Sequence, residues 1–434
     1  MSPGFVGLTG IVALFLLLLL RLPVWAALSL VGFVGNIVLS GWTSAFATLG
    51  QAPFDTASLY TLSVVPLFIL TGEVASGTGL SADLFKAAQV MLSGIRGGLA
   101  VATIGASACF GAVCGSSIAT AATMTPISLR EMRKAGYADS LATGSIAAGG
   151  TLGILFPPSI ILVIYGAIAQ QSVPKLFAAG LIPGLLLTAL YIVTALIVAA
   201  RRPLDAPAVP SAPMRDRIVA LRGPWQFLTL FVVTIGGIYA GIFSPTEAAS
   251  IGALGAILLG VVGRRLRLGA LINTVEGAVR TSCMLYVIII GANLFAYFIV
   301  QTQLPSLLAE QARVMALPGG LVMAFVVLAY ILMGCFLEAI GMILITVPVF
   351  LPLIVSYGYD PTWFGIIVVI VVEVGLIHPP VGMNLFVVQA QAPDIRTVTI
   401  YRGIVPFLVA PFALLVLLFL FPQLALWLPR LLYG

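Results

Sequence analysis

Residues 153–159 read Gly-Ile-Leu-Phe-Pro-Pro-Ser, and residues 375–381 read Gly-Leu-Ile-His-Pro-Pro-Val. Each stretch lies inside a long apolar segment, residues 138–168 in the first case and residues 361–391 in the second. Two adjacent prolines remove two backbone donors and clash with the preceding turn, so a helix cannot pass through them unbroken. Both segments are therefore predicted to be interrupted helices.

The two stretches are copies within an internal repeat. A shift of 222 positions superposes them, and it superposes other glycines and prolines along both halves without a gap. Because glycine and proline constrain the backbone more than other residues do, the halves share geometry. The matched positions include Pro23 with Pro245, Gly97 with Gly319, Pro126 with Pro348, Gly136 with Gly358, Gly153 with Gly375, and Pro157-Pro158 with Pro379-Pro380.

The composition is that of a membrane protein. Of the 434 residues, 61% are apolar and 8% are charged, whereas a soluble domain carries about 25% charged residues. The net charge is +6, but the basic residues lie in short clusters between apolar runs, which argues against nucleic-acid binding. Runs long enough to span a bilayer, which takes about 20 residues, cover residues 5–20, 24–48, 58–76, 176–200, 225–243, 246–262, 281–300 and 403–429.

Residues 98–130 are apolar but too short for two full spans, and Gly115-Ser116-Ser117 lies at their centre. We expect a re-entrant helical hairpin here and another at the repeat position, residues 320–356. Five crossings in residues 1–200 would invert the second repeat, residues 223–434, with residues 201–222 as a hydrophilic cytoplasmic linker. The predicted fold is an all-α polytopic membrane protein with inverted repeats, an architecture of secondary transporters.

The distribution of basic residues predicts the orientation. If the N-terminus is outside, 17 of the 20 lysines and arginines face the cytoplasm, including those of the linker. Only Lys175, Arg313 and Arg430 then lie outside. Cytoplasmic loops carry an excess of lysine and arginine, so we expect a periplasmic N-terminus. The first hairpin then opens to the cytoplasmic side and the second to the outer side.

The breaks and hairpin tips supply oxygen ligands. Backbone carbonyls freed at a break must be satisfied by protein, water or an ion, and together with hydroxyl and amide oxygens they suit a hard cation such as sodium. Helix N-termini beside the break favour an anionic group. We expect sodium as the only metal, no catalytic residue and no organic cofactor. The candidates are Gly115, Ser116, Ser117, Gly153 and Pro157 for sodium in the first half; Gly334, Glu338, His378, Pro379, Gly382 and Asn384 for sodium in the second half; and Ser117, Thr120, Pro158, Pro380 and Glu373 for the substrate.

Ionisable residues inside apolar segments are costly and often functional. Glu338 occupies the repeat position of Ser116, where it could bind or gate an ion or serve as a hydrogen-bonded structural acid. The same two alternatives, site-lining or structural, stay open for Glu373 and His378. Glu73 lies near the end of a span and is expected to be solvated, and Glu247 has the spacing of a helix cap.

Several motifs resemble the large membrane subunit of TRAP (tripartite ATP-independent periplasmic) transporters, the DctM-like family, and the resemblance covers essentially the whole chain. It implies a sodium-driven elevator in a bacterial inner membrane, in which hairpins and interrupted helices move against a scaffold. It also implies a small four-helix membrane partner, a periplasmic substrate-binding protein and organic-acid substrates. His378 departs from the pattern, in which a hydroxyl residue more often precedes this proline. The motifs are residues 115–121, 153–159, 245–248 and 379–386.

Other functions remain as alternatives. The nearest is a stand-alone sodium- or proton-coupled dicarboxylate carrier of related fold, which would need no binding protein. An intramembrane hydrolase using Ser116 or Ser117 with His378 is disfavoured, because residues 114–117 lack the Gly-x-Ser-Gly pattern of rhomboid proteases and the repeat partner of Ser116 is an acid. A passive channel is disfavoured because inverted interrupted helices suit alternating access. Which organic acid is carried stays open.

Overall fold

The computed structural model describes residues 2–334 and 337–434, and every regular element within them is helical. Cys335 and Phe336, inside the predicted second hairpin, lie outside the described residues. Seven helices are long and apolar enough to cross a membrane, or eight if the bent pair Met214–Ala220 and Trp225–Tyr239 forms one span. This confirms an all-α polytopic membrane protein.

The first half contains nine α-helices and two short 3₁₀ turns among the described residues. They are α1 (Pro3–Leu19), α2 (Val24–Ser58), η1 (Tyr60–Ser63), α3 (Val64–Gly77), α4 (Leu80–Met91), α5 (Gly98–Cys114), α6 (Ser117–Lys134), α7 (Asp139–Thr151), η2 (Leu152–Ile154), α8 (Ile160–Ala169) and α9 (Val173–Arg201).

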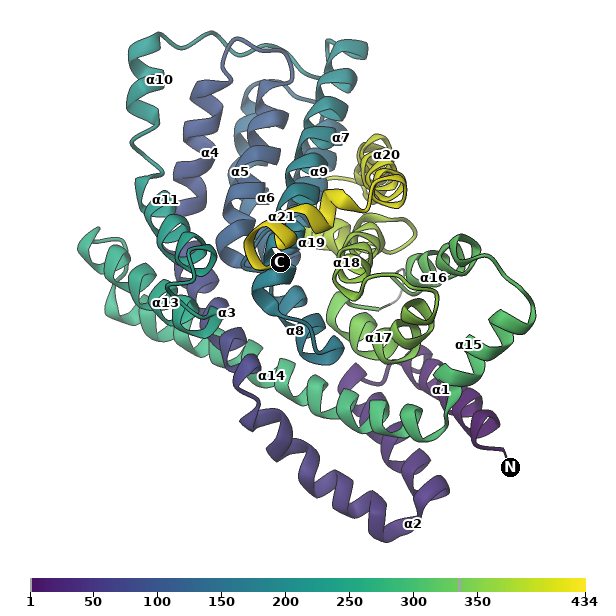
Figure 1. Cartoon of the computed structure of the whole chain (residues 1–434). Helices are drawn as coiled ribbons and strands as arrows, with labels where there is room; N and C mark the ends of the chain where they lie inside the picture. The colour runs from purple at the N-terminus through teal and green to yellow at the C-terminus, as the bar shows by residue number, and fades with distance from the viewer. Residues whose placement is uncertain (1, 335–336) are drawn as a thin grey trace.

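The second half repeats this order of long and interrupted helices (Figure 1). After α10 (Met214–Ala220) come α11 (Trp225–Phe231), the π-turn η3 (Val232–Gly236), α12 (Gly237–Tyr239), α13 (Pro245–Val262), α14 (Leu268–Gln301), α15 (Leu304–Val314), α16 (Gly319–Gly334), α17 (Ala339–Ser356), α18 (Pro361–Ile377), α19 (Met383–Gln391), α20 (Thr397–Leu420) and α21 (Gln423–Tyr433).

The two longest helices, α2 and α14, pack side by side along the lower edge of the molecule (Figure 1). Their close approach depends on Gly32, where a Cβ atom would lie 2.6 Å from the backbone carbon of Leu294. Small residues of this kind let membrane helices approach closely. Asn36 adds a hydrogen bond of 3.4 Å from Nδ2 to the carbonyl of Leu294. We call α2, α3, α13 and α14 the platform, because α3 packs against both α13 and α14.

The remaining long helices, α5–α9 and α16–α20, form what we call the bundle. Helix α18 lies in its interior, because every residue from Thr362 to Ile377 is buried. Helix α7 also packs tightly against α20, where a Cβ on Gly144 would overlap the backbone of Gly403. The bundle therefore interleaves elements from both halves.

Both Pro-Pro segments interrupt their helices. After η2 the chain is irregular until Ser159, whose hydroxyl donates to the carbonyl of Ile154 (2.5 Å) and accepts from the amide of Leu162 (3.2 Å). Ser159 thus caps α8, as serine commonly does at a helix start. In the second half, residues 378–382 separate α18 from α19, and Gly382 has a φ of 63°.

Some predicted boundaries were wrong. Helix α2 runs to Ser58 instead of ending at residue 48, with a kink at Gly41 (φ 81°) and with Pro53 inside it. Two hydrogen bonds stabilise the last turns of this helix: the Thr56 hydroxyl donates to the Ala52 carbonyl and accepts from the side-chain amide of Asn293 on α14. The run 403–429 is two helices, because the chain breaks at residues 421–422, where Pro422 begins a new helix.

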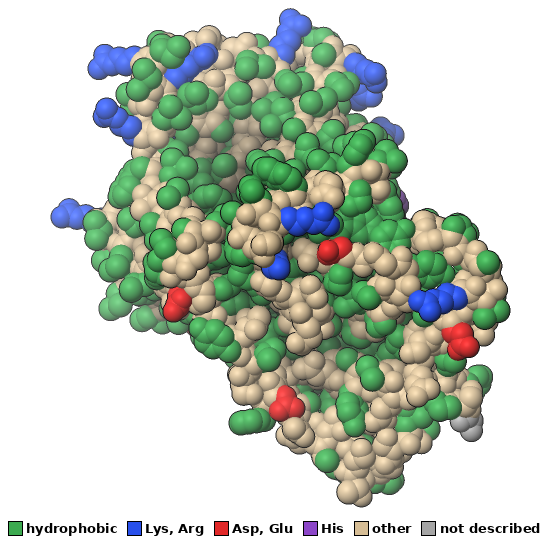
Figure 2. Space-filling model, viewed as in Figure 1, with side chains coloured by type: hydrophobic (Ala, Val, Ile, Leu, Met, Phe, Trp, Pro, Cys, Tyr) green, Lys and Arg blue, Asp and Glu red, His purple; other side chains and the backbone are tan. Residues whose placement is uncertain are grey.

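The surface is apolar through its middle and basic at one end. Figure 2 shows broad green areas across the centre, whereas most blue lysine and arginine side chains gather at the top of the view, where α10 lies in Figure 1. Helix α10 belongs to the predicted linker 201–222 and packs on α4. Its Arg217 donates to the carbonyl of Ser93 at 3.1 Å.

Candidate functional site

The tip between α5 and α6 lies directly on the first interruption. Gly115 has a φ of 64°, and a Cβ added there would lie 2.5 Å from the carbonyl oxygen of Pro158. Any larger residue would be strained in this conformation and would also collide with the interruption. The tip and the break of the first half therefore form one compact structure.

Backbone and hydroxyl oxygens converge at this contact. A Cβ on Gly153 would lie 2.7 Å from Thr120 Oγ1 and 2.9 Å from the Ser116 carbonyl oxygen. The Ser116 carbonyl accepts a hydrogen bond of 2.7 Å from the Thr120 hydroxyl, and the Ser116 hydroxyl accepts one of 3.3 Å from the Ala119 amide. The first half thus gathers oxygen ligands of the kind that sodium prefers.

The second half has a matching glycine contact. Gly375, the repeat partner of Gly153, lies against Gly334 of α16, and a Cβ on either glycine would be 2.7 Å from the other's Cα. Glu338 is the N-cap residue of α17, as Ser116 is of α6. The second interruption is more open than the first, because Pro380 is exposed whereas Pro158 is buried.

Both tips line a single cavity of about 520 Å³, which we call the tip cavity. Gly115, Ser116 and Ser117 line it from the first half, and Glu338 lines it from the second half. The start of α8 and the end of α18 contribute Ile160 and Leu376. The platform closes the remaining side with residues of α3 and α14. Residues that are 222 positions apart thus face the same space.

A hydrogen bond joins the two halves next to the cavity. Asn384 Nδ2 donates to the Ser117 hydroxyl at 2.6 Å, and both residues are buried. The Asn384 Oδ1 atom is enclosed without a hydrogen-bond partner among the described residues. A buried amide oxygen of this kind needs a partner, which an ion or water can supply.

Other predicted residues are not part of the cavity lining. Thr120 and Pro158 pack in the first half, and Gly153 and Pro157 are buried in the interruption. His378 is half-buried with its Nδ1 enclosed and unpartnered, and Pro380 accepts a hydrogen bond of 2.5 Å from Tyr401. Likewise, Pro379, Gly382 and Gly334 are absent from the lining residues.

Glu373, predicted to contact substrate, lies within the packed bundle instead of on the cavity. It is 0% exposed, and neither carboxylate oxygen has a hydrogen-bond partner among the described residues. It stands at the repeat position of Thr151, whose hydroxyl lies 3.1 Å from Tyr191 Oη. Helix α18 is buried on all sides, so its apolar sequence could not show which way Glu373 points.

Four polar lining residues were not assigned to the site from sequence. Glu73 and Ser76 come from α3, Thr123 from α6 and Thr281 from α14. The Ser76 and Thr123 hydroxyls lie 3.0 Å apart and join the platform to the bundle. Glu73 was expected to be solvated, and it is exposed to this cavity. None of the four is marked by the repeat, because their repeat positions carry unrelated residues.

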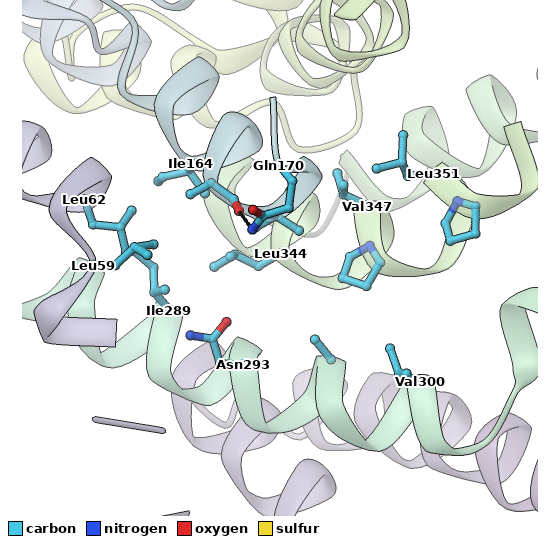
Figure 3. Close-up of a pocket in the computed structure, with 15 residues that line it drawn as sticks. Leu59, Leu62, Ile164, Gln170, Ile289, Asn293, Val300, Leu344, Val347 and Leu351 are labelled. Atoms are coloured by element: carbon cyan, nitrogen blue, oxygen red, sulfur yellow. Dashed lines mark hydrogen bonds between the residues drawn. The ribbon is translucent and has the colours of Figure 1, made fainter. Parts of the chain in front are cut away.

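A second hollow, of about 340 Å³, separates the platform from the bundle (Figure 3). Leu59, Ile289 and Val300 face it from the platform side, and Leu344 and Leu351 face it from α17. The two amide side chains in its lining already donate hydrogen bonds within the protein, from Gln170 to the Ala167 carbonyl and from Asn293 to the Thr56 hydroxyl. The hollow is therefore an apolar seam with little to hold a polar ligand.

The chain is similar to known proteins over most of its length. A profile of the family described as "Tripartite ATP-independent periplasmic transporter, DctM component" matches residues 11–424. The chain belongs to this DctM family. A large permease protein of a C4-dicarboxylate TRAP transporter from Pseudomonas aeruginosa is 37% identical to this DctM component over 378 residues, which cover 87% of this chain and 88% of that protein.

Two further similarities extend the comparison. A sialic acid TRAP transporter permease protein from Haemophilus influenzae is 30% identical over 425 residues, which cover 95% of this DctM component and 68% of the longer relative. The crystal structure of the YdaH transporter from Alcanivorax borkumensis superposes with a TM-score of 0.62 at 16% identity, covering 90% of this chain and 89% of that one. The DctM component thus shares its fold with a transporter of distant sequence.

Proposed function

We propose that this DctM component imports small organic acids across a bacterial inner membrane by sodium-coupled, elevator-type alternating access. The observation that carries the proposal is the shared position of Ser116 and Glu338. These residues are 222 positions apart, and both line the tip cavity. Inverted repeats that meet at one site are the architecture of secondary transporters, in which the same site is exposed to each side in turn.

Sodium would bind where each tip meets the interruption of its own half. In the first half the carbonyls of Ser116 and Pro158 and the hydroxyl of Thr120 surround Gly115 and Gly153. The unpartnered Oδ1 of Asn384 is an available ligand next to the second interruption. We assign sodium to Gly115, Ser116, Ser117, Gly153 and Pro157 in one half and to Gly334, Glu338, His378, Pro379, Gly382 and Asn384 in the other. Of the residues predicted to contact substrate, Ser117 lines the tip cavity, whereas Thr120, Pro158 and Pro380 do not. Ser116 and Glu338 line the cavity as well, so substrate and sodium would share them.

The moving body would be the part of the bundle made of two re-entrant hairpins, α5–α6 and α16–α17, and the two interrupted helices, α7–α8 and α18–α19. It faces the platform across the apolar hollow of Figure 3, where few polar contacts must break. The hydrogen bond between Ser76 and Thr123, at the tip cavity, is a polar contact between platform and bundle that the movement would break. Sliding of the moving body along this apolar surface should cost little free energy, because the apolar side chains exchange contacts with one another for contacts with equally apolar lipid. The inverted repeats would supply the two end states.

The transporter would work with two partners. The family is described as tripartite, and the Haemophilus influenzae relative is longer than this chain. We infer a small four-helix membrane subunit and a periplasmic binding protein that delivers the substrate. The basic end in Figure 2 would face the cytoplasm, which leaves the N-terminus in the periplasm.

Reconstitution tests this proposal. Proteoliposomes would contain the chain with its small membrane subunit, and the cognate binding protein would be added outside with labelled organic acids. The proposal expects uptake that needs both the binding protein and an inward sodium gradient. Uptake without the binding protein would identify the stand-alone carrier instead, and uptake driven only by a proton gradient would remove sodium from the account.

A further inference from the structure

We propose that the tip cavity selects a carboxylate that also bears a cationic group, such as an ammonium, with the carboxylate at Ser116 and the cation at Glu338. This inference rests on the proposed function and names its substrate class. It follows from a break in the repeat symmetry. The two tips occupy equivalent positions, but one carries a neutral hydroxyl and the other a carboxylate.

The Ser116 end of the cavity suits an anion. Ser116, Ser117, Ile118 and Ala119 all line the cavity, so the first turn of α6 opens into it. The Ser116 hydroxyl accepts from the Ala119 amide, whereas the amides of Ser117 and Ile118 have no hydrogen-bond acceptor among the described residues. Unsatisfied amides at the positive end of an 18-residue helix attract a negative group.

The Glu338 end has the opposite character. Glu338, Ala339 and Ile340 line the cavity where α17 begins, so this helix also directs its positive end inward. Here the carboxylate of Glu338 stands at the helix N-terminus and offsets that positive end itself. Its Oε1 atom is enclosed without a hydrogen-bond partner among the described residues. A buried carboxylate oxygen of this kind needs a hydrogen-bond donor, which a cationic ligand or water can supply.

The remaining charge in the cavity has the same sign. Glu73 of α3 is the other ionisable residue among the described lining residues, apart from the thiol of Cys114. No lysine, arginine or histidine belongs to that lining. A dicarboxylate would therefore place its second negative group against Glu338, where the described lining offers no side-chain cation and the proposed sodium ion would have to offset both carboxylates. A cationic group at that position would instead be attracted, and a cavity of about 520 Å³ has room for a small molecule.

Three probes of matched length test the inference: 4-aminobutyrate, 4-hydroxybutyrate and succinate. Their binding would be measured on the chain with its small membrane subunit in lipid nanodiscs at saturating sodium, without the binding protein. We expect 4-aminobutyrate to bind at least tenfold more tightly than succinate, with 4-hydroxybutyrate between them. Equal binding of the three would overturn this inference alone, whereas binding of none would also count against the proposed carboxylate transport.

Variants separate selectivity from sodium binding and from folding. Glu338→Gln should weaken the binding of 4-aminobutyrate about tenfold and strengthen the binding of succinate, and it should leave the binding of 4-hydroxybutyrate nearly unchanged. If Glu338 only holds sodium, the variant would weaken all three alike and raise the sodium requirement, which contradicts the inference. Ser116→Asp should weaken all three probes. Glu310→Gln on α15 is the matched control, and thermal unfolding in sodium checks that each variant is folded.

Discussion

Asn384 of α19 donates a hydrogen bond of 2.6 Å to the hydroxyl of Ser117 of α6, across 267 positions of sequence. The bond links the interruption of the second half to the tip of the first half. It has no symmetric copy, because the repeat positions of these residues hold Ala339 and Leu162. The two proposed sodium sites are therefore connected by a direct contact between polar side chains.

Replacing Asn384 with leucine should raise the sodium concentration needed for half-maximal uptake by tenfold or more. The change removes the bond to Ser117 and the unpartnered Oδ1 that we assign to sodium. It leaves the buried Ser117 hydroxyl without this donor, a loss of about 1–3 kcal/mol in folding stability. Sodium titration of uptake and thermal unfolding measure the two effects.

Asn293→Leu is the matched control for this prediction. Asn293 also donates through its amide to a hydroxyl, that of Thr56 at 2.8 Å, but it does so within the platform. It should lower stability without changing the sodium requirement. If both variants shift the sodium curve equally, the assignment of Asn384 to sodium is wrong.

Gly153→Ala and Gly375→Ala should each destabilise the protein and slow transport. A Cβ at Gly153 would lie 2.7 Å from Thr120 Oγ1, and one at Gly375 would lie 2.7 Å from the Gly334 Cα. Overpacking of this kind costs about 1–3 kcal/mol in the free energy of unfolding. Gly105→Ala on α5 is the control, because its Cβ would meet nothing within 4 Å. Comparable melting temperatures for all three variants would contradict the packing described here.

Because of the ion pairs of Arg133, the folding stability of the protein should fall at acidic pH. The Arg133 guanidinium donates to Asp139 (2.7 Å) and Asp394 (2.6 Å), which joins α6 to the start of α7 and to the segment after α19. The hydrogen bond from Arg133 lowers the pKa of Asp394 below its usual value. A lowered pKa adds stability above the unfolded value, about 3.9, and that stability is lost as the pH falls through the folded value.

Thermal unfolding of wild type and Arg133→Gln between pH 3 and 7 measures this dependence. We expect the wild type to be the more stable protein near neutral pH and the two curves to converge at the acidic end. Lys134→Gln, which removes only the exposed local pair with Glu131, should change the melting temperature less. Parallel curves that never converge would mean that Asp394 contributes nothing through its ionisation.

The interruptions and tips could be predicted from sequence because they depend on local chemistry. Adjacent prolines break a helix wherever they lie, and the shift of 222 positions marks both Pro157-Pro158 and Pro379-Pro380. The same shift pairs Gly153 with Gly375, and the structure shows a close contact at each, to the Thr120 hydroxyl and to the Gly334 backbone.

The contacts between halves could not be predicted in the same way. The bond from Asn384 to Ser117 depends on how α19 packs against α6, and no local pattern encodes that packing. Glu73 and Thr281 reach the tip cavity only because α3 and α14 pass beside both tips. Glu373 shows the converse, since its place just before the second interruption suggested the site but the surrounding apolar residues bury it.

The contact between Ser76 and Thr123 tests the movement of bundle against platform most directly, since their hydroxyls lie 3.0 Å apart. Both residues would be changed to cysteine after Cys109, Cys114, Cys283 and Cys335 are replaced by alanine. Ser40→Cys with Gln301→Cys is the matched control, because that pair joins α2 to α14 within the platform at 2.7 Å. The measurement is sodium-driven uptake before and after oxidation, and again after reduction. The account predicts that the Ser76–Thr123 cross-link abolishes uptake and that reduction restores it, while the control cross-link leaves uptake unchanged. Full uptake by the cross-linked Ser76–Thr123 variant would contradict the elevator movement.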